Sequence, residues 1–213
     1  MILYRPTDGS PHLGPLSLRP RCCFVMTQLG GPPDEVRAIR RRLGAVLRRR
    51  AYSVIDADSA VTGRDFLLKI WEMLVSVPLG IAVIHESMRP GTIANVFYEL
   101  GLMQACGKET LVVKSPGAAV PSDFVRTEYV EVGDGFEARV RRYLDSLDER
   151  ARYYSVVAEQ LDNNPLLAID YLRRAYLLTR DAGLRERMKE IFGDAGLTTR
   201  ARDSVERLLL PLD

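Results

Sequence analysis

The chain has 213 residues, a formal net charge of +2, and a composition that is 46% hydrophobic and 27% charged. These values are typical of a globular protein with one domain and an appendage, or with two small domains, and they exclude a general electrostatic attraction to nucleic acid or to a membrane. Three cysteines, two of them adjacent, make no disulfide framework, and the two histidines have no spacing that suits a metal site. No apolar run is long enough to span a membrane, so we expect a cytoplasmic protein.

Five short apolar segments alternate with segments of helical periodicity over most of the chain. They follow a proline-rich stretch, residues 1–20, which we expect to be a flexible N-terminal arm. The predicted strands are residues 22–27, 52–56, 79–85, 110–114 and 127–132, and the predicted helices between them are residues 34–50, 66–75 (opened by a capping box at 62–65) and 91–105. Short apolar strands that alternate with helices form a parallel sheet covered on both faces, so residues 21–133 are predicted to be an α/β domain with the flavodoxin-like strand order 2-1-3-4-5.

Residues 134–213 have helical periodicity only and are predicted to form a C-terminal helical extension. Their apolar positions, including Leu208 to Leu210 at the end, exceed those that one short helical layer can bury. We therefore expect a homo-oligomer that assembles through this extension, with packing on the sheet as the alternative.

Arginines are concentrated between Arg37 and Arg50, where they alternate with apolar residues at helical spacing. The pattern favours the solvated outer face of an amphipathic helix, and an anionic partner is the alternative. A nucleic-acid partner is not expected.

The helix predicted after the third strand has very few polar side chains. One apolar stripe is formed by Ile93, Val96, Leu100 and Met103, and a second stripe of mostly small residues by Ala94, Tyr98, Gly101 and Ala105. A helix that is apolar nearly all round is expected to be buried, with the small stripe close to the sheet. Asn95 and Glu99 share one face of this helix at i and i+4. An unpaired buried carboxylate is costly, so Glu99 is the first candidate for a functional role.

The predicted strand order places a ligand crevice beyond the carboxyl ends of the first and third strands. Residues 28–33 and 86–91 follow these two strands, and Glu99 lies about two turns into the helix that comes next. The architecture therefore predicts a nucleotide-sized ligand at this edge of the sheet.

The segment Asn95-Val-Phe-Tyr-Glu-Leu-Gly101, followed by Gly107-Lys108 and a strand, resembles the TIR-like and nucleoside 2-deoxyribosyltransferase-like nucleotide-binding domains. In that family the helix after the third strand commonly reads N-x-x-Y-E-x-G and is followed by G-K and a strand. Pro121-Ser-Asp-Phe124 also resembles the short segment that precedes the family's last strand. The resemblance covers roughly residues 21 to 133 and implies a TIR-like, flavodoxin-like fold.

The resemblance implies N-glycosidic bond chemistry, with a glutamate at the position of Glu99 that faces a ribose. TIR-like enzymes cleave NAD between nicotinamide and ribose, commonly as immune or cell-death effectors that act when assembled, so NAD would be a substrate and not a cofactor. Deoxyribosyltransferases use the glutamate as a nucleophile, and they usually have an aspartate at the end of the third strand, where this chain has His85-Glu86. That departure favours an NAD glycohydrolase. The alternative of a different class is a nucleotide-sensing or scaffold module without turnover.

Glu99 and Asn95 are accordingly the candidate catalytic residues. The candidate substrate-binding residues are Thr27, Gly30, Gly31, Asp56, Arg64, Arg89 and Tyr98. Backbone N–H groups of the two glycines are suited to phosphate, the two arginines to pyrophosphate, and the aspartate to a ribose hydroxyl. Each has a structural alternative: a turn for the glycines and the aspartate, a solvated surface for the arginines, and a core position for Tyr98, as for Trp71.

Overall fold

The computed structural model describes the chain except for residues 1, 2, 13, 15, 58–65, 125–127, 162, 195, 197, 200, 201, 204 and 207–213. Two compact units make up the fold. One is Cys22–Leu144, and the other joins Met1–Arg21 to Asp145–Asp213.

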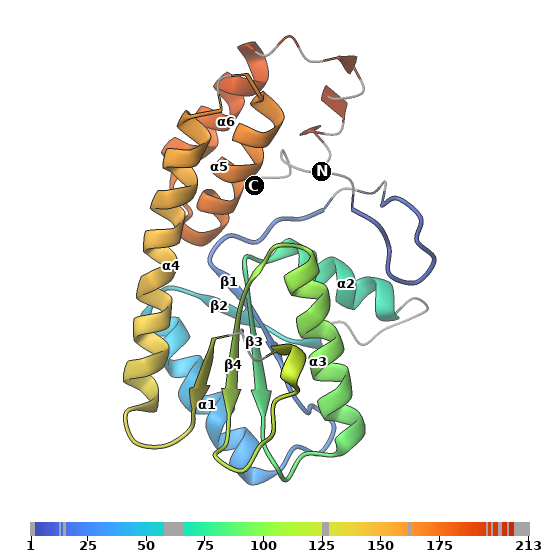
Figure 1. The fold of residues 1–213 in the computed structure, drawn as a ribbon, viewed down its shortest axis with the longest axis vertical. Coiled ribbons are helices and arrows are strands. Elements are labelled where there is room, and N and C mark those ends of the chain that lie inside the picture. Colours follow the sequence, from blue (N-terminus) through green and yellow to red (C-terminus); the bar gives the residue numbers. More distant parts are fainter. Residues whose placement is uncertain are drawn as a thin grey trace. The chain divides into compact units, whose positions relative to one another are not determined.

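A five-stranded parallel sheet forms the centre of the first unit (Figure 1). Its strands, in the order β2-β1-β3-β4-β5, are β1 (Cys22–Met26), β2 (Ser53–Ile55), β3 (Leu79–Ile84), β4 (Glu109–Lys114) and β5 (Tyr129–Glu131). The predicted α/β class and flavodoxin-like strand order are confirmed. All residues of β1 and β3 are buried, which explains their continuous apolar sequences, whereas β2 and β5 are short, partly exposed edge strands.

Helices α2 (Phe66–Ser76) and α3 (Pro90–Ala105) cover one face of the sheet, and α1 (Asp34–Arg49) lies on the other (Figure 1). The side chains of Phe24 and Met26 on β1 share one core with Leu74 of α2 and Leu100 of α3. In a strand the next residue faces the opposite side, so Val25 is directed to the α1 face. Helix α1 has Asp34 and Glu35 in its first turn and arginines in its last, which suits the helix dipole.

Gly80 of β3 explains how α3 comes close to the sheet. A Cβ atom at this position would lie 2.1 Å from Sδ of Met103 on α3 and 2.9 Å from Cε of Met26 on β1. The space that a side chain would fill is therefore occupied by Met103, which is fully buried. The absence of a side chain at Gly80 fixes which stripe of α3 packs on the sheet.

We expect Gly80→Val to destabilise the protein by about 1–3 kcal/mol, because the added atoms overfill a packed core. Urea unfolding followed by circular dichroism measures this change. Gly91→Ala is a matched control, since a Cβ atom at Gly91 meets no atom within 4 Å and its φ angle is not positive. Equal stability of the valine variant and the wild type would mean that α3 is not held at this distance.

The prediction that α3 is buried nearly all round is wrong. Only Val96, Phe97, Leu100 and Met103 are buried, whereas the stripe predicted to lie on the sheet is largely exposed at Ala94, Tyr98 and Ala105. Tyr98 is 55% exposed, so the core position expected for its side chain is also wrong, while Trp71 is buried as predicted. The larger stripe packs on the sheet because Gly80 provides room for Met103.

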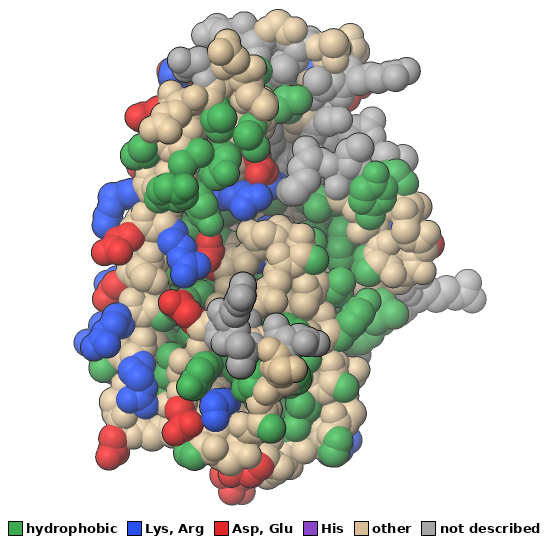
Figure 2. Space-filling view, viewed as in Figure 1, with side chains coloured by type: hydrophobic (Ala, Val, Ile, Leu, Met, Phe, Trp, Pro, Cys, Tyr) green, Lys and Arg blue, Asp and Glu red, His purple; other side chains and the backbone are tan. Residues whose placement is uncertain are grey.

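The second unit includes the second half of α4 (Phe136–Glu159), α5 (Pro165–Thr179) and α6 (Ala182–Asp194). Helix α5 begins with Pro165, and the side chain of Asn164 accepts a hydrogen bond from Leu167 N at 3.1 Å. Charged side chains of both signs follow one another along α4 (Figure 2). Within the described ranges no helix combines the length and the hydropathy that a membrane-spanning segment requires.

The units differ from the predicted boundaries in two ways. Helix α4 begins after the predicted boundary and continues from one unit into the other: its residues up to Leu144 belong to the sheet unit, where Tyr143 Oη donates to Thr110 O at 3.0 Å. In place of a loose arm, the N-terminal residues belong to the helical unit: Leu18 lies in its core, and Arg21 N donates to Leu177 O at 2.8 Å. Leu208 to Leu210 lie outside the described residues.

Candidate functional site

The loops that follow β1 and β3 are joined by Gln28. Its side-chain amide donates to Gly31 O at 2.8 Å, and its Oε1 accepts from Arg89 N at 3.1 Å, across the two loops. Arg89 Nη2 also donates to Gly30 O. Gln28 is buried, so these bonds hold the two loops together at the predicted crevice position, the carboxyl ends of neighbouring parallel strands.

The glycines of the first loop have distinct roles. Gly31 has a φ of 62°, a left-handed conformation that glycine adopts without strain. Gly30 is exposed, and a Cβ atom there would contact Arg89 Nη2 at 3.7 Å. The structure thus brings three predicted substrate-binding residues together, and the guanidinium of Arg89 lies over the glycine backbone.

Thr27, at the end of β1, contributes a hydroxyl that has no partner among the described residues. Its Oγ1 is buried and makes no hydrogen bond, and the residue is 8% exposed. A buried polar atom without a partner is uncommon in a folded protein and costs free energy. Thr27 is therefore a buried polar group without a hydrogen-bond partner, next to Gln28 in the sequence.

At the end of β3, His85 and Glu86 are held by local hydrogen bonds. His85 Nδ1 accepts from Ser87 N at 3.1 Å and lies 2.7 Å from Ser87 Oγ. Glu86 accepts a hydrogen bond from the Ser115 hydroxyl, which follows β4. These contacts fix the turn that leads into α3, whose first residue is Pro90.

Glu99 lies on α3 at the border between its buried and exposed faces. Its neighbours one turn away, Val96 and Met103, are buried, and Asn95 on its own face is exposed. Within the part of the chain that the structure describes, the carboxyl group makes no hydrogen bond or ion pair. Burial without a compensating partner raises the pKa of Glu99 from 4.5 to about 7.

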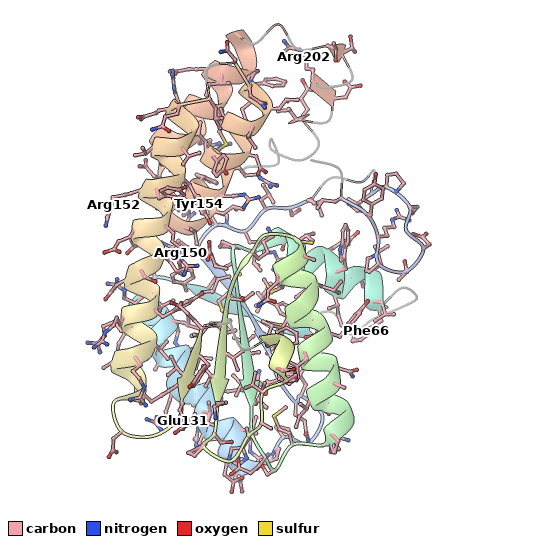
Figure 3. The ribbon with its side chains drawn as sticks, in the orientation of Figure 1. Phe66, Glu131, Arg150, Arg152, Tyr154 and Arg202 are labelled. Carbon is pink, nitrogen blue, oxygen red and sulfur yellow. The ribbon has the colours of Figure 1, made fainter. Side chains whose placement is uncertain are left out.

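The other candidate residues lie apart from this group or outside the described ranges. Asp56 follows β2 and forms an ion pair with Arg40 of α1, with 2.5 Å between Oδ2 and Nη2. Arg64 lies outside the described residues. Tyr98 on α3 is exposed, as is Phe66 at the start of α2, which Figure 3 labels. Glu99 and Arg89 lie about 15 Å apart along α3.

Two residues with a structural part in the site were not predicted. Gln28 joins the two loops. Phe124, in the 3-10 helix Ser122–Phe124, packs on Phe97 of α3 with 5.0 Å between the ring centroids. A polar residue directly after a buried strand is a signal that pointed to Gln28, whereas the contact of Phe124 depends on tertiary packing.

No group of three metal-ligating side chains is found among the described residues. Of the two cavities described for this structure, one lies beside α1 and the other among the helices of the second unit, and Glu99 lines neither. The chemistry that Glu99 suits is that of a carboxylate acting on a bound ligand.

Comparisons with known proteins add little to this description of the site. No protein-family model matches the chain, and no curated protein matches it. A solved structure, the Clostridium botulinum CMP N-glycosidase BcmB, is similar over 58% of this chain and 97% of that chain, with 17% sequence identity and a TM-score of 0.39. A likeness of that size is too slight to argue from, and the fold is established by the strand order of the chain itself.

Proposed function

We propose that the chain is a nucleotide N-glycosidase, that NAD is its substrate, and that Glu99 is its catalytic carboxylate. The observation that carries the proposal is the Glu99 side chain itself: half-buried, without a partner among the described residues, and with a pKa raised to about 7. A carboxylate in this condition is unfavourable in the free protein. It is stabilised when positive charge develops beside it, and this is a common property of groups in functional sites.

The reaction needs such a group. When the bond between C1′ of the ribose and the nicotinamide nitrogen breaks, the electron pair leaves with nicotinamide and an oxocarbenium ion forms at C1′. The charge of Glu99 stabilises this ion, and water then adds to C1′, giving ADP-ribose, nicotinamide and one proton. Nicotinamide in NAD is already cationic, so its departure requires no general acid.

The neighbouring residues fit the remaining parts of a dinucleotide. Asn95 is exposed on the same face of α3 as Glu99 and can donate to a ribose hydroxyl. The guanidinium of Arg89 and the backbone around Gly30 and Gly31 offer donors to a pyrophosphate. The segment from Asn95 to Gly101 resembles TIR-like domains, and this resemblance supports NAD over other nucleotides. It also extends the proposal to an assembly-regulated immune effector, such as one of antiviral defence, that acts as a homo-oligomer in the cytoplasm.

The second candidate is a module that binds the nucleotide without turnover. It rests on the loops after β1 and β3, which Gln28 and Arg89 join and which offer donors to a nucleotide whether or not a reaction follows. A base-exchange enzyme like the deoxyribosyltransferases is the third, and it would use Glu99 as a nucleophile.

Incubation of the full-length protein with NAD tests these candidates directly. We expect nicotinamide and ADP-ribose to appear in equal amounts by liquid chromatography, because one bond is broken and water is the acceptor. Deoxyinosine with free adenine, incubated in parallel, tests base exchange. Binding of NAD without release of nicotinamide would replace the enzyme by the binding module, and formation of deoxyadenosine would favour the transferase.

A further inference from the structure

We propose that a groove along α1, separate from Glu99, binds a nucleoside polyphosphate such as a nucleoside triphosphate. The groove has a volume of about 860 Å³, within the range of small-molecule sites. One side of α1 lines it, together with Val25 of β1 and Val54 of the edge strand β2, which form its floor. All of its lining residues belong to the sheet unit.

The basic part of the groove is a stripe on one side of α1. Arg37, Arg41, Gly44 and Arg48 are spaced at i, i+4, i+7 and i+11, so they lie on one face of the helix. The guanidinium of Arg48 lies over Gly44, since a Cβ atom there would be 3.3 Å from its Nη1. This position is about one turn back along the helix, so the guanidinium of Arg48 lies nearer to the turn of Arg41 than its own Cα does.

The charges of Arg41 and Arg48 are not compensated. Both residues are exposed, and neither makes a hydrogen bond or an ion pair with any residue that the structure describes. The other two arginines of the groove are occupied, Arg37 by Asp34 and Arg40 by Asp56. Two free guanidiniums one to two turns apart form a site for an anion with several oxygens, such as a di- or triphosphate.

Gly44 supports this interpretation independently. Glycine is among the least favourable residues in a helix interior, so its presence in the middle of α1 calls for a structural reason. Gly44 is buried, and the three nearest atoms that an added Cβ would meet outside the helix backbone all belong to the guanidinium of Arg48. The glycine therefore leaves the space in which the guanidinium of Arg48 lies along the helix surface.

The rest of the groove indicates what accompanies the phosphates. Val54 is 38% exposed at its floor and gives an apolar surface on which a base can lie. Asp34 and Glu35 stand at the N-terminal end of the groove, about 10 Å from Arg41 along the helix. Carboxylates repel phosphate but accept hydrogen bonds from ribose hydroxyls or an amino group, so the ligand would be oriented with its phosphates towards Arg41 and Arg48.

Isothermal titration of the full-length protein with ATP, tripolyphosphate and adenosine tests the proposal. We expect ATP to bind at least about tenfold more tightly than either of its parts, because charge and apolar surface act together. Arg41→Gln/Arg48→Gln should weaken ATP binding by roughly tenfold or more, since two charge-assisted contacts are lost. Arg141→Gln/Arg142→Gln is the matched control: it removes the same charge from exposed positions of α4 that do not line the groove, and should change the affinity by less than about twofold.

A second variant tests the groove without changing any charge. Gly44→Leu fills the space beneath Arg48 and should also weaken ATP binding, whereas Glu99→Gln should not, because Glu99 lies outside the groove. Any of three results would overturn the proposal. The α4 control could lose as much affinity for ATP as the groove variant, tripolyphosphate could bind as tightly as ATP, or both groove variants could bind ATP as tightly as the wild type. A ten-nucleotide single-stranded DNA that binds more tightly than ATP, in a manner that depends on Arg41 and Arg48, would assign the groove to nucleic acid instead.

Discussion

Glu99→Gln should lower the turnover of NAD by roughly 10²-fold or more, because it removes a charge placed to stabilise an oxocarbenium ion. Glutamine keeps the size of the side chain and its hydrogen-bonding groups, so the loss should appear in kcat and only weakly in KM. Chromatographic measurement of nicotinamide release at several NAD concentrations gives both constants. Glu149→Gln, which changes an exposed glutamate on α4, should leave both unchanged.

The same substitution should make the folded protein more stable at alkaline pH. Burial raises the pKa of Glu99 from 4.5 to about 7, so the folded state holds the proton more tightly than the unfolded state. The stabilisation that the protonated carboxyl provides is complete below pH 4.5 and is lost as the pH rises towards 7. Allowing for partial exposure, the advantage of the glutamine variant should grow by about 2 kcal/mol between pH 5 and pH 8.

Thermal unfolding of both proteins at the two pH values measures this advantage. A change of about 2 kcal/mol corresponds to roughly 4–8 °C for a chain of this size. Loss of turnover together with a gain in stability is the signature of a residue kept for function. If Glu99→Gln leaves the turnover unaltered, Glu99 is a structural residue. If Glu99→Gln lowers the melting temperature at both pH values, the carboxylate has a partner in the folded protein.

The fold could be predicted because the sequences of the central strands reflect the burial of these strands. Strands that are buried on both faces, such as Leu79–Ile84, must be apolar at every position, and helical segments between them require parallel crossovers. The edge strands were predicted to be longer than they are, because β2 and β5 pair on one side only and are partly exposed. The boundary at residue 133 differs from the structure because a helix such as α4 can continue from one core to another without a change in its periodicity.

The site could be predicted only in part. The strand order placed the loops after β1 and β3 together, and the structure joins them through Gln28 and Arg89. The orientation of α3 was not predictable from its own residues, because two stripes were similarly apolar and the choice between them depends on Gly80 of another strand. The ion pair between Asp56 and Arg40 likewise depends on how α1 lies beside β2.

The value of kcat/KM for NAD should rise by roughly 90-fold between pH 5 and pH 8, as the fraction of charged Glu99 increases through a pKa of about 7. The direction follows from the role of the group: a carboxylate that stabilises a cation acts only when it has lost its proton, and at pH 5 about one molecule in a hundred has done so. The cationic nicotinamide ring of bound NAD favours the charged form, so the profile of kcat should be displaced to lower pH than that of kcat/KM.

A His85→Gln variant, which changes a side chain at the end of β3, serves as the control and should keep the same midpoint. Steady-state rates of nicotinamide release in buffers of constant ionic strength give both profiles. A flat profile would mean that the charge of Glu99 does not enter the reaction. A rate that falls with rising pH would show that the protonated carboxyl is the active form. Glu99 would then be a general acid that donates a proton to the leaving group, and the substrate would carry a neutral base in place of the cationic nicotinamide of NAD.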